Sequence, residues 1–510
     1  MNLLKSFINI SVLTLFSRIL SFIRDFIIAY TFGVSISTDA FFIAFKIPNL
    51  LKRIFAEGAF LQIIIPILIQ YKKQNSNITK KFFSAIFGFM ILMLCFLTFM
   101  GIYFAPYIIC IIVPGFFKKK LLFSLTVKLL RITFPYIFFI SLSSLTTAIL
   151  NIWDCFLIPV CSPILLNTSM IIFSLFFTKF FHTPIFALSW SVVFGGILQF
   201  LYQFFFLTRI DMLVSPTINF KILQISSLLK KIGLGILGVS ANHISLLINS
   251  ILSSLFISGS VSWMYYADRL IEFPVGILGI SLGTILLSSL TKSIVYSKRD
   301  QFCKLIDWAM RISFIIGLPS SLMLYILSHP LITVLFQYGK FTKFDTMMTE
   351  RSLIGYSIGL LGLVLVKVLS PAFYARQDIK TPMIISFITI CITQIINLFF
   401  LFMKFGNLGL SLSISFSAWF NCMLLYWYLY RKRFFKFQPG WLNFILKIIF
   451  STLIMLIILT IILHCMPDWN VGSVWYKANR LLMIIISSWL IYFTILFIFG
   501  MRIQQFYFKV

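Results

Sequence analysis

Apolar runs of about 20 residues or more recur along almost the whole sequence, and each is long enough to cross a bilayer as a helix. Only 11% of the 510 residues are charged and the mean hydropathy is +1.03, which excludes an ordinary soluble protein. Because lipid cannot hydrogen-bond exposed backbone, such continuous runs should be helices, whereas a transmembrane barrel needs segments of alternating polarity. The sequence therefore predicts an all-α polytopic membrane protein with about fourteen transmembrane helices.

The basic residues lie in short clusters between the apolar runs, and these clusters predict the topology. When the loops between successive predicted helices are numbered from the N-terminus, the even-numbered loops contain about eighteen Lys and Arg residues and the odd-numbered loops about nine. Cytoplasmic loops are the ones enriched in these residues. We therefore expect a multi-pass protein of the cell inner membrane with both termini in the cytoplasm. The same distribution explains the formal net charge of +29 without a nucleic acid partner.

A long basic connection from about Lys221 to Lys231 divides the first twelve predicted helices into two sets of six. Two such sets around a substrate path are common in secondary transporters. We expect an N-lobe over residues 1–220, a C-lobe over residues 221–437, and a C-terminal helix pair over residues 438–510.

The sequence carries no pattern typical of an enzyme or a metal protein. Its eight cysteines include no C-x-x-C pair, and it has neither a phosphate-binding G-x-x-x-x-G-K-[ST] loop nor a nucleophile elbow. The four histidines are more readily explained by packing than by ligation. We therefore expect no covalent catalysis, no cofactor and no bound metal.

Ionisable residues inside the apolar runs are the most informative about function, since each costs roughly 2.5–3.5 kcal/mol or more at a helix centre. They form three clusters, the second of which also includes the neutral Asn49: Arg18, Arg24 and Asp25; Asp39, Asn49, Lys52, Arg53 and Glu57; and Asp268, Arg269 and Glu272. Steps of four residues place Asn49, Arg53 and Glu57 on one helix face, and likewise Asp268 and Glu272. The planar guanidinium of Arg suits a phosphate, although salt bridges that fix helix packing would also explain individual pairs.

Around these clusters the sequence resembles the MurJ (MviN) family of the multidrug/oligosaccharidyl-lipid/polysaccharide exporter superfamily. The resembling blocks run in order along the chain and include Phe16-Ser17-Arg18, Thr38-Asp39-Ala40-Phe41-Phe42, Ile47-Pro48-Asn49-Leu50-Leu51, Phe55-Ala56-Glu57-Gly58-Ala59-Phe60, Ser262-Trp263-Met264-Tyr265-Tyr266-Ala267-Asp268-Arg269 and Phe336-Gln337-Tyr338-Gly339-Lys340-Phe341. The resemblance implies fourteen helices, two six-helix lobes around a central cationic cavity, and a final helix pair that forms a groove for the lipid tail. It implies a flippase that moves lipid II from the cytoplasmic to the periplasmic leaflet by alternating access.

The resemblance also implies roles for individual residues. Arg18, Arg24 and Arg269 match arginines of the cavity, Asp39 and Glu57 match acidic functional positions, and Asn49, Ser262 and Glu272 match positions that line the cavity. Lys52 stands where the family usually has Arg, so it keeps the charge but loses the bidentate fork. The expected partners are lipid II and membrane lipids, with coupling to the membrane potential or a cation, in a monomer.

Three other functions remain open on the residues alone. A flippase for another polyprenyl-linked oligosaccharide would need similar cationic groups. A non-transporting scaffold for cell-wall enzymes would tolerate their removal. A cationic-drug antiporter of the same superfamily would need an acidic cavity, which the basic clusters disfavour.

Overall fold

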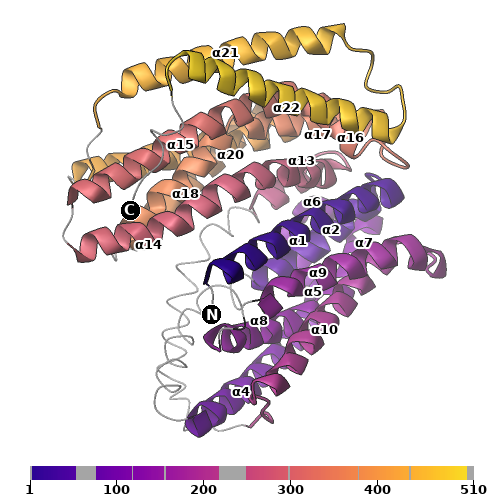
Figure 1. Cartoon of the computed structure of the whole chain (residues 1–510). Helices are drawn as coiled ribbons and strands as arrows, with labels where there is room; N and C mark the ends of the chain where they lie inside the picture. Colours follow the sequence, from indigo (N-terminus) through magenta and orange to yellow (C-terminus); the bar gives the residue numbers. More distant parts are fainter. Residues whose placement is uncertain are drawn as a thin grey trace. The chain divides into compact units, whose positions relative to one another are not determined.

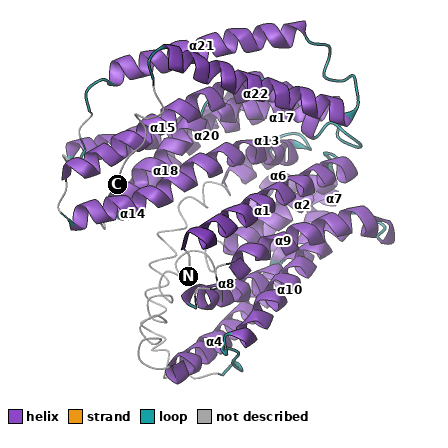
Figure 2. Ribbon diagram, in the orientation of Figure 1, coloured by secondary structure: helices purple, strands orange, loops and turns teal. Residues whose placement is uncertain are grey.

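Every regular element in the described part of this computed structural model is helical, as Figures 1 and 2 show. The structure describes residues 3–52, 76–117, 119–153, 155, 157–217, 248–296, 299–376, 378, 380–432, 434–435 and 438–501. These residues divide into two compact units. Unit 1 comprises Met1–Ser262 with Tyr338–Phe341, and unit 2 comprises Trp263–Gln337 with Thr342–Val510.

Unit 1 contains the helices up to α10. Their bounds are α1 Leu3–Phe32, α2 Ile36–Lys52, α4 Ser76–Tyr103, α5 Ala105–Ile112, α6 Pro114–Phe117, α7 Lys120–Thr133, α8 Tyr136–Ile152, α9 Leu157–Ile172 and α10 Ile185–Arg209, with a π-helical turn, η2, over Phe173–Phe177 and a 3-10 turn, η3, over Thr178–Phe180. The helix α10 packs against α8 and α9, α1 packs against α9, and α2 packs against α7. A core of Phe, Leu and Ile side chains from α4, α8 and α10 holds one part of the unit together.

Unit 2 contains most of α13 and all later helices. Their bounds are α13 Ser260–Val275, α14 Ser281–Val295, α15 Arg299–Ile326, α16 Ser328–Leu335, α17 Lys343–Ser357, α18 Leu360–Tyr374, α19 Lys380–Phe402, α20 Gly406–Arg431, α21 Trp441–Cys465 and α22 Val474–Ile498, with a π-helical turn, η4, over Gly276–Ile280. The helix α20 packs against α17, α18 and α19, while α21 and α22 pair with each other. One apolar core joins α14, α15, α18 and α20, and a second joins α15 and α16 to α21 and α22.

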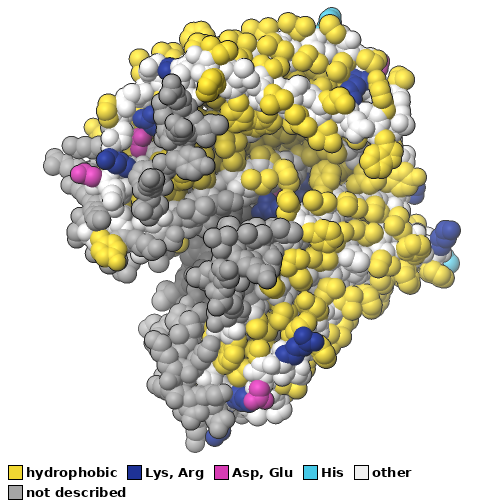
Figure 3. Space-filling view, in the orientation of Figure 1, with side chains coloured by type: hydrophobic (Ala, Val, Ile, Leu, Met, Phe, Trp, Pro, Cys, Tyr) yellow, Lys and Arg dark blue, Asp and Glu magenta, His cyan; other side chains and the backbone are white. Residues whose placement is uncertain are grey.

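The described residues confirm a membrane-spanning α-helical architecture. Nine of their helices are long and apolar enough to cross a membrane, or ten if the bent pair α17–α18 is one span. Hydrophobic side chains also cover most of the described surface of each unit in the view of Figure 3. The count of fourteen helices and the lobe bounds stay predictions, since the expected boundary at 220/221 lies outside the described residues.

A bend of 43° separates α17 from α18. Gly355 and Gly359 pack directly against Ser411 and Ser415 of α20, and a Cβ at Gly359 would lie 2.5 Å from the Cα of Ser415. Small residues spaced by four allow two membrane helices to approach this closely. The bend therefore brings both halves of the broken helix against α20.

Candidate functional site

The first predicted cluster forms a buried ion pair in α1. Arg24 and Asp25 expose only 4% and 1% of their surface, and the Arg24 guanidinium donates to Asp25 Oδ1 from Nε at 3.0 Å and from Nη2 at 2.7 Å. Nη1 donates to Asn167 Oδ1 of α9 at 2.8 Å. Because a buried charge is stable only when paired, this network fixes Arg24 and ties α1 to α9. Arg18, on the same helix, is half-buried.

The second cluster contributes Asp39, which caps a helix that begins 220 residues later in the chain. Asp39 Oδ2 accepts from the backbone N–H of Gly259 at 2.5 Å, and Oδ1 accepts from the backbone N–H and the hydroxyl of Ser262 at 2.9 and 2.6 Å. Gly259 has a φ of +100°, a backbone conformation that favours glycine. A carboxylate at the amino end of a helix satisfies N–H groups that lack intrahelical partners and complements the helix dipole. Asp39 and Ser262, both predicted site residues, are therefore brought together at the start of α13.

The rest of the second cluster is only partly described. Asn49 and Lys52 lie half-buried in the last turn of α2. Arg53 and Glu57 lie outside the described residues, so the expected shared face of Asn49, Arg53 and Glu57 stays a prediction.

The third cluster lies on α13 in unit 2 and is accessible. Arg269 Nη1 donates to Glu272 Oε2 at 2.7 Å, and the guanidinium carbon lies 5.0 Å from the ring centroid of Tyr265. The Arg269 side chain retains 28% exposure and that of Glu272 53%, and Asp268 is also exposed. The neighbouring carboxylate and ring orient the Arg269 guanidinium, and the side chain as a whole stays partly exposed.

Sequence reasoning missed several polar residues in the helices. Lys46 of α2 donates from Nζ to Ser250 Oγ at 2.6 Å, Asn167 accepts from Arg24, and Lys367 of α18 packs against Gly279. The signal for Lys46 was present, because it is an isolated charge three residues before Asn49 and so lies on the stripe that includes Asn49.

Comparisons with known proteins identify the family. The family model described as lipid II flippase MurJ matches residues 28–478. A probable lipid II flippase MurJ of Buchnera aphidicola subsp. Acyrthosiphon pisum is 49% identical over 510 residues, which is 100% of both chains. The chain belongs to the lipid II flippase MurJ family.

Other relatives agree with this membership and confirm the resemblance noted in the sequence. A lipid II flippase MurJ of Burkholderia cenocepacia is 39% identical over 462 residues, or 89% of each chain. Among solved structures, a lipid II flippase MurJ in an inward closed conformation matches with a TM-score of 0.80 and 27% identity, covering 97% of this chain and 98% of that one. An inward-facing multidrug resistance MATE family transporter matches with a TM-score of 0.67 at 13% identity over 83% of this chain and 98% of its own, which shows the shared fold alone.

Proposed function

We propose that this chain translocates lipid II, the undecaprenyl-diphosphate-linked peptidoglycan precursor, from the cytoplasmic to the periplasmic leaflet by alternating access. The observation that carries the proposal is the full-length membership of the MurJ family, whose relatives are named for lipid II. The transfer breaks and forms no covalent bond, so the protein acts as a transporter of the inner membrane and not as an enzyme.

The ligand's diphosphate needs cationic donors at the point where it leaves the headgroup region. Arg269 suits this role, because its guanidinium is oriented by Glu272 and Tyr265 and its side chain is partly exposed. Two parallel N–H···O bonds to neighbouring phosphate oxygens would give both affinity and orientation. In this proposal Arg18, Lys52 and Arg53 add further positive charge, and Asn49, Glu57, Asp268 and Glu272 line the path.

Arg24 and Asp39 take a different part in the proposal. Their polar groups are engaged with Asp25, Asn167, Gly259 and Ser262, and each is almost fully buried. These residues would set which conformation of α1, α2 and α13 is stable, so exchange of their partners during transport would change access to the substrate.

Three further features belong to the same proposal. The six-helix lobes span residues 1–220 and 221–437, and the pair over 438–510 accommodates the polyprenyl tail. Both termini face the cytoplasm, as the loop charges favour. The chain works as a monomer, and the membrane potential or a cation drives its return step, since moving one charge through 100 mV is worth about 2.3 kcal/mol.

Complementation of a bacterium depleted of its own lipid II flippase tests the proposal. The native chain, Arg269→Ala and Arg269→Lys are compared at matched membrane abundance, with Arg351→Ala as the control because Arg351 is also an exposed arginine of unit 2. We expect rescue by the native chain and the control, failure of Arg269→Ala, and partial rescue by Arg269→Lys, which keeps the charge without the fork.

Two outcomes would count against it. Full rescue by Arg269→Ala would overturn the role of the guanidinium and favour a scaffold function. Failure of the native chain, when it is inserted at normal abundance, would instead favour a different polyprenyl-linked oligosaccharide as substrate.

A further inference from the structure

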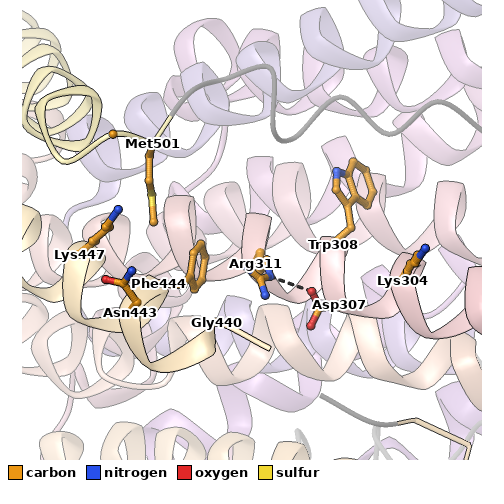
Figure 4. Close-up of a pocket in the computed structure, with 10 residues that line it drawn as sticks. Lys304, Asp307, Trp308, Arg311, Gly440, Asn443, Phe444, Lys447 and Met501 are labelled. Carbon is orange, nitrogen blue, oxygen red and sulfur yellow. Dashed lines mark hydrogen bonds and ion pairs between the residues drawn. The ribbon is translucent and has the colours of Figure 1, made fainter. Parts of the chain in front are cut away.

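A pocket of about 380 Å³ lies in unit 2 between the amino-terminal parts of α15 and α21 and the residues that follow α22 (Figure 4), and its lining includes no residue of the three clusters described above. Its lining includes three cationic side chains and a single carboxylate: Lys304, Asp307 and Arg311 of α15 and Lys447 of α21. Figure 4 shows Lys304 and Lys447 at opposite ends of the group, with the Arg311–Asp307 pair between them. The pocket is therefore electropositive at both ends.

The carboxylate of Asp307 is already satisfied within the protein. Its Oδ2 accepts from Arg311 Nε at 2.7 Å, and its Oδ1 accepts from Trp441 Nε1 at 2.6 Å. Arg311 also stacks against Trp441 and Phe444, with its guanidinium carbon 5.3 and 5.0 Å from their ring centroids. Arg311 and Asp307 thus form a fixed ion pair with almost no net charge.

Lys304 and Lys447 add positive charge to the pocket, and the carboxylate of Asp307 does not neutralise it because it is paired with Arg311. Neither ammonium group forms an ion pair with any described residue. Lys304 is exposed and Lys447 is half-buried. An anion between them would gain two charge-assisted contacts without breaking an ion pair to any residue in the described part of the chain.

The start of α21 adds backbone donors to the same pocket. Gly440 is the N-cap of α21, has a φ of +91° and provides no side-chain cap. The first N–H groups of a helix have no intrahelical acceptors, and the helix dipole favours negative charge there. A Cβ at Gly440 would meet nothing within 4 Å, so the space beside this residue of the pocket lining is open.

The surroundings favour a lipid over a soluble anion. The helix α21 is one of the candidate membrane spans, and only 28% of its most apolar window is buried. Leu442, Leu446 and Phe450, which begin its exposed face, retain 79%, 45% and 55% exposure. Acyl chains could lie along this face while the headgroup occupies the pocket. The pocket lies at the amino end of α21, and the basic connection Arg431-Lys432-Arg433 precedes this helix in the sequence.

We propose that this pocket binds the headgroup phosphate of an anionic glycerophospholipid, held by Lys304, Lys447 and the amino end of α21. The lipid bridges α15 and α21 at the membrane surface, so it is a ligand distinct from the transported substrate. The site does not depend on the proposed function.

Native mass spectrometry of the full-length protein in detergent tests this site. The native chain is compared with the double variant Lys304→Gln/Lys447→Gln and with the matched control Lys343→Gln/Lys380→Gln, which removes two exposed lysines of unit 2 outside the pocket. Phosphatidylglycerol, phosphatidylcholine and inorganic phosphate are added separately. Arg311 is left intact because it holds Asp307 and Trp441 in place.

We expect the double variant to bind phosphatidylglycerol at least about tenfold more weakly, since each basic residue near a membrane surface contributes roughly 1 kcal/mol. The control should bind it as the native chain does, and phosphatidylcholine binding should be weak and equal in all three. An equal loss in the control, or no loss in the double variant, would overturn the site. Displacement of phosphatidylglycerol by an equal concentration of inorganic phosphate would overturn its assignment to a lipid.

Thermal unfolding separates an effect of the substitutions on protein stability from an effect on lipid binding. The two double variants should unfold at the same temperature in detergent without added lipid. Added phosphatidylglycerol should stabilise the native chain and the control more than the Lys304→Gln/Lys447→Gln variant, because only a ligand that binds the folded state raises stability. Equal stabilisation of all three proteins would overturn the proposal.

Discussion

Replacing Asp39 should loosen the first turn of α13. In the native chain the Asp39 carboxylate accepts from two backbone N–H groups, those of Gly259 and Ser262, and from the Ser262 hydroxyl. Net contributions of hydrogen bonds to charged groups are about 1.5–3 kcal/mol each. Asp39→Ala removes the acceptor from both amides, so their hydrogen exchange should accelerate by about tenfold or more, since about 1.4 kcal/mol corresponds to one factor of ten.

Asp39→Asn should have a smaller and asymmetric effect. The carboxamide retains one oxygen, which can accept from either Ser262 or Gly259, while its NH₂ group would face the other donor. One of the two amides should therefore keep most of its protection. The graded order of native, Asn and Ala distinguishes a lost acceptor from general unfolding.

Hydrogen exchange measured by mass spectrometry in detergent, on peptides that contain Gly259 and Ser262, is the direct assay. Asp211→Ala is the matched control, because Asp211 is a carboxylate of unit 1 with 96% side-chain exposure. The capping box of Thr342 and Asp345 at α17 gives an internal reference that should not change. Unchanged exchange of the Gly259 and Ser262 amides in Asp39→Ala would refute the capping role.

Two further perturbations follow from charged groups that the structure pairs. Arg24→Ala removes the guanidinium that pairs with the buried Asp25 carboxylate, which should cost about 3–5 kcal/mol of stability and lower the unfolding temperature in detergent. Arg24→Ala/Asp25→Ala should recover part of this loss. A double variant no more stable than the single variant would contradict this reasoning. The hydrogen bond that the His329 imidazolium donates to the Glu350 carboxylate, opposed by partial burial, raises the pKa of His329 above 6.5. The stabilisation from this pair should therefore be fully present below about pH 6.5 and be lost as the pH rises through the raised pKa. His329→Gln should flatten the dependence of the unfolding temperature on pH. An unaltered dependence would contradict the contribution of this pair.

The sequence predicted the helical architecture well because the bilayer imposes one dominant constraint. Runs such as Trp441–Cys465 and Val474–Ile498 must be helices if they cross lipid, whatever their neighbours are. The bend between α17 and α18 was not predictable in the same way. It depends on the fit of Gly355 and Gly359 against α20, and a hydropathy pattern carries no information about which helix a glycine will face.

The candidate site also combines residues that sequence rules can single out with contacts that only the folded structure reveals. Rules about charges in apolar runs singled out Asp39, and the family resemblance added Ser262. Neither could reveal that the Asp39 carboxylate caps α13, because that contact joins residues more than 200 positions apart. Asn167 escaped notice for a related reason: a single neutral amide in an apolar run acquires meaning only when Arg24 is found against it.

Arg24 and Arg269 satisfy the same sequence rule but have different surroundings, and the proposed function gives them different roles for that reason. For Arg24 to bind a diphosphate, its guanidinium must leave the buried carboxylate of Asp25. Arg269 pairs with Glu272, whose side chain is 53% exposed, and an exposed ion pair of this kind is worth roughly 0–1 kcal/mol. Loss of Arg269 should therefore reduce rescue without reducing stability, whereas loss of Arg24 should reduce both. Rescue normalised to membrane abundance separates a residue that contacts the substrate from one that holds the helices in place.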